Sequence, residues 1–126
     1  MNQAYQVYQT NSVQTASPQE LSLMLYNGCL KFMKLAKKAF DEKNIEAKHT
    51  NLTKAQAIIN QFRITLDMDV ELSKDLDALY EFINDQLVKA NIQNNLEALQ
   101  VAEDMVRELR DTWKQMMKQG TAPVSV

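Results

Sequence analysis

The sequence has few of the residues that form turns and cross-links. Its 126 residues include two glycines, two prolines and one cysteine, and aromatic residues make up 7%. A β-rich domain of this length needs many turns, which draw on glycine, proline, asparagine and aspartate. One cysteine excludes an intramolecular disulfide and is typical of a reducing compartment. We therefore expect a helical protein with an apolar core.

The chain also has neither a large excess of charge of one sign nor a long apolar run. The net charge is −2 and the pI is near 5.4, which argues against nucleic-acid binding because that function normally needs a basic surface. No apolar stretch approaches the ~20 residues of a membrane span. Residues 1–16 lack the basic and apolar regions of a secretory signal. We expect a cytoplasmic protein with no membrane insertion.

The clearest local signal is a helix start at residue 17. Ser17 as N-cap, Pro18 at the first helical position and Glu20 three residues after the cap form a capping box. The pattern predicts a helix from residue 18 to about 41, with the Ser17 hydroxyl accepting from the Glu20 amide. Cys29 lies in an apolar stripe of this helix, which favours a buried small hydrophobe over a nucleophile.

Three further helices follow from apolar residues that recur at alternating three- and four-residue steps. Asn44 is the candidate cap of a helix to about residue 66, and residues 67–69 form a tight break before the next. Asn95 is the candidate cap of the last helix, which Gly120 helps to end. The predicted core seams are Ile45, Leu52, Ala55, Ile59, Phe62 and Leu66; Leu72, Leu76, Leu79, Ile83, Leu87 and Ala90; and Leu96, Leu99, Ala102, Val106, Leu109, Trp113 and Met116.

Short loops between helices of matched length force antiparallel neighbours. The predicted fold class is therefore all-α, an antiparallel up-down-up-down four-helix bundle over residues 17–119. A mobile N-terminal segment over 1–16 and a disordered tail over 120–126 are expected to flank it. Core packing is expected for Tyr80, Phe82 and Trp113, with Tyr80 the best candidate for a rim position because its hydroxyl needs a partner or water.

The first predicted helix is apolar over more than half its circumference, whereas a bundle helix needs one stripe about 100° wide. One interpretation is that it is the most buried helix of an asymmetric bundle. The other is that its second flank is a groove for a partner. Burial of four large side chains is worth ~6–12 kcal/mol, the scale of micromolar binding. We expect this groove to be formed by Leu23, Tyr26, Leu30 and Met33, and to be covered by a cap formed by Tyr5, Val7 and Tyr8.

The sequence offers no candidate catalytic site. It has no Gly-rich phosphate loop, nucleophile elbow or paired cysteines. Glu46 and His49 have the spacing that di-iron bundles use, but such a site needs two of these motifs and the chain has one histidine. We predict that the protein is not an enzyme and has no cofactor or metal site.

Several blocks of the sequence resemble the FliS family of flagellar secretion chaperones. The most specific block is 13–28, from Val-Gln-Thr-Ala-Ser-Pro-Gln-Glu-Leu to Leu-Met-Leu-Tyr-Asn-Gly. Weaker similarities lie at 54–59, 76–80 and 109–113, in the same order and spacing. One departure from the family is the turn at 67–69, which lacks the glycines common there. This difference is not expected to affect function.

The resemblance implies an antiparallel helical bundle that binds the C-terminal segment of flagellin in the cytosol. It implies that the protein prevents premature polymerisation of this partner and delivers it to the flagellar type III export gate. It also implies an N-terminal segment that covers an apolar surface in the free protein. We expect a monomer or weak homodimer when free. The alternative is a small regulatory or structural bundle that forms homo-oligomers through the same apolar stripe.

Overall fold

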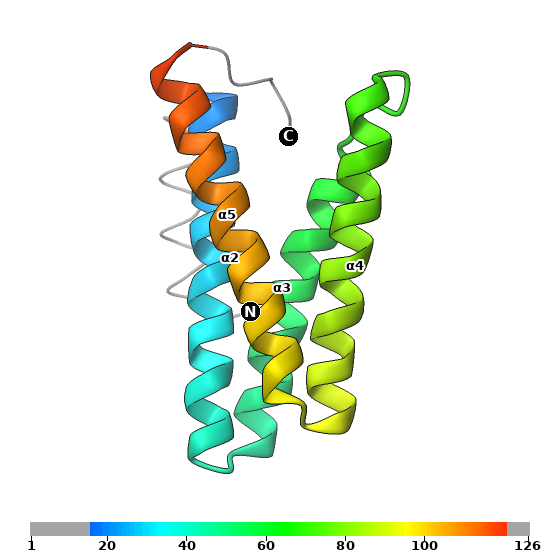
Figure 1. The fold of residues 1–126 in the computed structure, drawn as a ribbon. Coiled ribbons are helices and arrows are strands. Elements are labelled where there is room, and N and C mark those ends of the chain that lie inside the picture. The colour runs from blue at the N-terminus through cyan, green and yellow to red at the C-terminus, as the bar shows by residue number, and fades with distance from the viewer. Residues whose placement is uncertain (1–15, 121–126) are drawn as a thin grey trace.

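The computed structural model describes residues 16–120, which form four α-helices and no strands. Helix α2 spans Pro18–Asp41, α3 Ile45–Ile64, α4 Glu71–Gln93 and α5 Leu96–Lys118. The helices pack in the ring α2–α3–α4–α5, and consecutive helices run in opposite directions (Figure 1). The predicted up-down-up-down bundle is therefore confirmed.

Three of these four helices begin at a side-chain cap. Ser17, Asn44 and Asn95 each accept a hydrogen bond from the backbone amide three residues further on, at 3.0 or 3.1 Å. Each such bond satisfies one of the amides that a helix start leaves without a partner. Helix α4 is the exception, because its N-cap is Val70, which has no side-chain acceptor.

An aromatic cluster in the core takes one ring from each helix. Tyr26 stacks on Phe62 at 4.4 Å between ring centroids, and Phe62 stacks on Tyr80 at 5.5 Å. Trp113 lies tilted against Tyr26 at 6.4 Å. The Tyr26 and Tyr80 hydroxyl oxygens are 2.7 Å apart. The default expectation of core packing for Tyr80 is confirmed and the rim alternative is not, since its side chain is 2% exposed and its hydroxyl partner is a second buried tyrosine.

Most residues of the predicted core seams are buried, but those at the helix starts are exposed. Ile45, Leu72 and Leu96 are 73%, 54% and 44% exposed. Each lies in the first turn of its helix, at an end of the bundle. Periodicity identifies the face that a residue occupies, but it does not show whether a neighbour reaches that far along the axis.

A buried lysine joins the two loops at one end of the bundle. Lys48, near the start of α3, is 6% exposed. Its Nζ donates to the Asn91 carbonyl oxygen at 2.9 Å and to Asn94 Oδ1, and it lies 5.6 Å from the centre of the Phe40 ring. A cation at the C-terminal end of α4 also interacts favourably with the helix dipole. We call this end, with the α2–α3 and α4–α5 connections, the loop end.

None of the helices in residues 16–120 is long and apolar enough to cross a membrane.

Candidate functional site

The four predicted groove residues lie along α2, and the structure encloses three of them. Tyr26, Leu30 and Met33 are 4%, 5% and 0% exposed and belong to the core. Leu23 is half-buried and packs against that core. Burial in the core accounts for the apolar character of three of the four residues without a partner. Contact of these four residues with a partner remains a prediction.

The position of α2 explains this burial. Tyr26 is surrounded by aromatic rings from the other three helices. Helix α2 has nine buried residues, against five or six in each of the others. Its wide apolar surface is thus accounted for largely by the first interpretation above, that it is the most buried helix of an asymmetric bundle.

The predicted cap residues Tyr5, Val7 and Tyr8 lie outside the described residues. The same is true of almost all of the N-terminal segment and of residues 121–126. A cap over α2 therefore stays a prediction.

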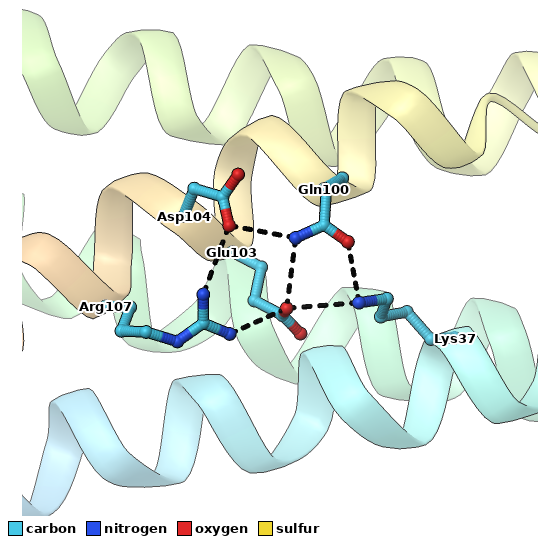
Figure 2. Close-up of polar contacts among 5 residues, drawn as sticks. All are labelled: Lys37, Gln100, Glu103, Asp104 and Arg107. Carbon is cyan, nitrogen blue, oxygen red and sulfur yellow. Dashed lines mark hydrogen bonds and ion pairs between the residues drawn. The ribbon is translucent and has the colours of Figure 1, made fainter.

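A polar cluster connects α2 and α5 (Figure 2). Glu103 is 2% exposed, and its Oε1 accepts from Lys37 Nζ at 3.1 Å and from Arg107 at 2.8 Å. Gln100 accepts from Lys37 at 2.7 Å and donates to Asp104 at 2.9 Å. The two cations and two carboxylates balance, so the cluster is neutral as a unit.

The electrostatics of this cluster favour a structural role. Burial alone acts to raise the pKa of Glu103, and it is the largest single influence. The hydrogen bonds and charges of Arg107 and Lys37 together outweigh it and hold the pKa below its ordinary value. Glu103 is therefore ionised at neutral pH and serves as an acceptor that joins the helices, not as an acid catalyst.

The other candidate chemical groups are also occupied or enclosed. Residues 16–120 contain no group of three or more side chains able to hold a metal ion. His49 Nδ1 shares a 2.8 Å hydrogen bond with the side chain of Asn91. Cys29 is fully buried, its thiol donates to the Ala55 carbonyl oxygen at 3.7 Å, and burial raises its pKa to about 12. The prediction of a buried, unreactive Cys29 is confirmed.

Several apolar side chains of α4 and α5 are only half-buried. Figure 1 shows the two helices leaning apart from the loop end toward the end at which α2 begins and α5 ends. We call this second end the open end. Leu76 and Leu79 of α4 and Leu109 and Met117 of α5 are only partly buried against the core. The three leucines were expected in closed seams, because a seam has the same period whether its helices touch or diverge.

The chain was compared with known proteins, beginning with protein families. The family model described as "Flagellar protein FliS" matches residues 1–120. The flagellar secretion chaperone FliS of Bacillus subtilis is 47% identical over 114 residues, covering 90% of this chain and 86% of its own.

This chain belongs to the FliS family.

Two further similarities agree with this membership. The flagellar secretion chaperone FliS of Escherichia coli is 34% identical over 119 residues, covering 91% of this chain and 88% of its own. A solved structure described as a flagellar chaperone from bacteria matches with a TM-score of 0.75 at 18% identity, over 93% of this chain and 97% of its own, and supports the fold. FliS proteins are chaperones rather than enzymes, so the prediction that this chain is not an enzyme is confirmed.

Proposed function

We propose that this FliS protein binds the C-terminal segment of flagellin in the cytoplasm, prevents its premature polymerisation and delivers it to the flagellar type III export gate. The observation that carries the proposal is the family match over residues 1–120, together with relatives named flagellar secretion chaperones. The absence of a metal-binding group and of a reactive cysteine in residues 16–120 is compatible with a binding protein.

The mechanism follows from the way an amphipathic segment binds an apolar surface. A disordered client segment folds as helices when its apolar face packs against exposed apolar side chains. Leu23 of α2 and the half-buried leucines of the open end have surface left to cover. Ordering the client costs free energy, which lowers the net affinity and keeps release at the export gate possible. While the segment is bound, the surfaces through which it would polymerise stay covered, and they are exposed only on release.

Substitution of Leu23 by glutamate tests the α2 contact. Leu23 is suited to this test because it is half-buried, whereas Leu30 is enclosed and its substitution would damage the core. We expect Leu23→Glu to keep the far-ultraviolet helical signal and to weaken binding of a flagellin C-terminal peptide by at least about tenfold, since a charge replaces apolar contact area. Fluorescence anisotropy with labelled peptide gives the dissociation constant.

The matched control is Val101→Glu, which places the same charge on an exposed position of α5. It should bind the peptide as the unsubstituted protein does. If Leu23→Glu binds the peptide normally, Leu23 is not part of the client-binding surface. Failure of the unsubstituted protein to bind would contradict the proposed function itself.

Light scattering at several concentrations separates this function from the homo-oligomer alternative. A chaperone should be a monomer or weak homodimer when free and form a one-to-one complex with the peptide. Self-association that is unaffected by the peptide would favour the structural bundle instead.

A further inference from the structure

Four large apolar side chains are exposed where α3 passes into α4. Ile64 is 77% exposed, Met68 48%, Val70 51% and Leu72 54%. They lie within residues 64–72, the last position of α3, the connection and the start of α4. We call these four residues the corner patch. Single exposed apolar residues are ordinary on a protein surface, but a group in one short segment marks an interaction site or an aggregation risk.

The start of α4 departs from the pattern of the other three helices. Ser17, Asn44 and Asn95 are side-chain caps, but the corresponding residue of α4 is the exposed Val70. Replacing a polar cap by an aliphatic residue typically costs ~1 kcal/mol of stability. Departures from local rules without a structural compensation are typical of functional positions. The valine makes no cap hydrogen bond and instead adds to the corner patch.

The charge around the corner patch is mainly negative. The carboxylates of Asp67, Asp69, Glu71 and Asp75 are exposed, and none forms an ion pair with a described residue. Lys74 is the one cation in residues 64–75, so the segment has four acids and one base, a net charge of −3. The whole chain has a net charge of −2. Glu71 also suits the positive end of the α4 dipole, but Asp67 and Asp69 precede that helix.

The loop end provides an internal comparison. Ile45 and Ile92 are 73% and 75% exposed there, so apolar exposure alone does not distinguish the corner patch. Acids and bases are mixed in the sequence around Ile45, where Asp41 and Glu42 are followed by Lys43, Glu46 and Lys48. Apolar exposure and a net negative charge coincide at the corner patch.

We propose that the corner patch binds a basic amphipathic segment of a partner protein. Apolar side chains of that segment would cover the four exposed residues, and its lysines or arginines would face the acids around them, which complements the charge and steers association. We expected no functional role for residues 67–69 from the sequence. The corner belongs to α3 and α4 and stands apart from the ends of α2 and α5 (Figure 1). It is therefore separate from the Leu23 surface.

The probe for this site is a fluorescein-labelled peptide of leucine and lysine, with leucines at helical three- and four-residue steps. Binding is measured by anisotropy on the full chain. We expect Met68→Ser combined with Leu72→Ser to weaken binding by at least about tenfold, because two contact side chains are lost. Ile45→Ser combined with Ile92→Ser is the matched control, with equal or greater exposure at the loop end, and should leave binding unchanged.

The charge contribution is tested separately. Asp67→Asn combined with Asp69→Asn should weaken binding severalfold at low salt and flatten its salt dependence, since fewer charges remain to be screened. Asp41→Asn combined with Glu42→Gln removes the same charge at the loop end and should have no such effect. Circular dichroism verifies that every variant is folded.

Three results would overturn the proposal: no binding of the leucine–lysine peptide, equal losses in the corner and loop-end variants, or equal binding of a leucine–glutamate peptide. Because this test uses no flagellin peptide and leaves Leu23 intact, its failure would not affect the proposed client function.

Discussion

At the scale of single residues, the Tyr26–Tyr80 pair is a polar contact inside an apolar core. Both side chains are almost fully buried, and each hydroxyl is the other's partner at 2.7 Å. Burial is the largest influence on both phenols and raises the pKa of each above its ordinary value, so both stay protonated. A buried hydroxyl that loses its partner keeps the cost of desolvation without the hydrogen bond.

A double-mutant cycle tests this coupling. Tyr80→Phe should lower the free energy of unfolding by about 1–3 kcal/mol, because it leaves the Tyr26 hydroxyl buried without a partner. Tyr26→Phe combined with Tyr80→Phe should cost less than the sum of the two single changes, since neither polar group then remains. Urea unfolding followed by circular dichroism measures both quantities. Additive losses would mean that water reaches the pair.

At the scale of helices, the caps show which parts of the structure could be predicted. Ser17, Asn44 and Asn95 were identified because capping depends on one side chain and a backbone three residues away. The open end and the Tyr26–Tyr80 contact were missed because they depend on the angle and register between helices. Asn91 pairs with His49 and Asp77 with Arg63 across α3 and α4, and neither contact follows from the period of one helix.

The uncapped start of α4 leads to a prediction at this scale. Val70→Asn should raise the free energy of unfolding by about 0.5–1 kcal/mol, because it supplies the missing acceptor. The same change removes an exposed apolar side chain from the corner patch and should weaken binding of the leucine–lysine peptide.

Thermal unfolding and anisotropy measure the two effects on the same sample. Asn95→Ser provides a control, since it exchanges one good cap for another and should change neither quantity appreciably. A stabilised variant with unchanged peptide binding would exclude Val70 from the corner site.

At the scale of the whole molecule, the bundle follows from the sequence, but the client surface does not. Helix number, boundaries and direction come from periodicity, caps and loop length. The sequence could not assign Tyr26, Leu30 and Met33 to a client surface or to the core, because they have the same apolar character in either place. The amount of space that three other helices leave around α2 is a property of the assembled fold.

Deletion of residues 1–15 tests the predicted cap. If this segment competes with the client, its removal should tighten binding of the flagellin C-terminal peptide, by roughly tenfold where the uncovered form is one molecule in ten. Leu23→Glu in the shortened chain should abolish most of that gain. Calorimetric titration of both lengths measures the change, and equal or weaker binding by the shortened chain would contradict capping.

Lys48 fixes the two helical hairpins to each other at one extremity of the molecule. Its contacts with Asn91 and Asn94 connect the start of the second helix of one hairpin to the end of the first helix of the other. Any displacement of one hairpin relative to the other is therefore restrained at this end by the lysine. At the opposite end, Trp113 Nε1 donates to the Gln19 carbonyl oxygen at 3.0 Å, so a guest segment that wedges between the hairpins there has to displace this contact between α5 and α2.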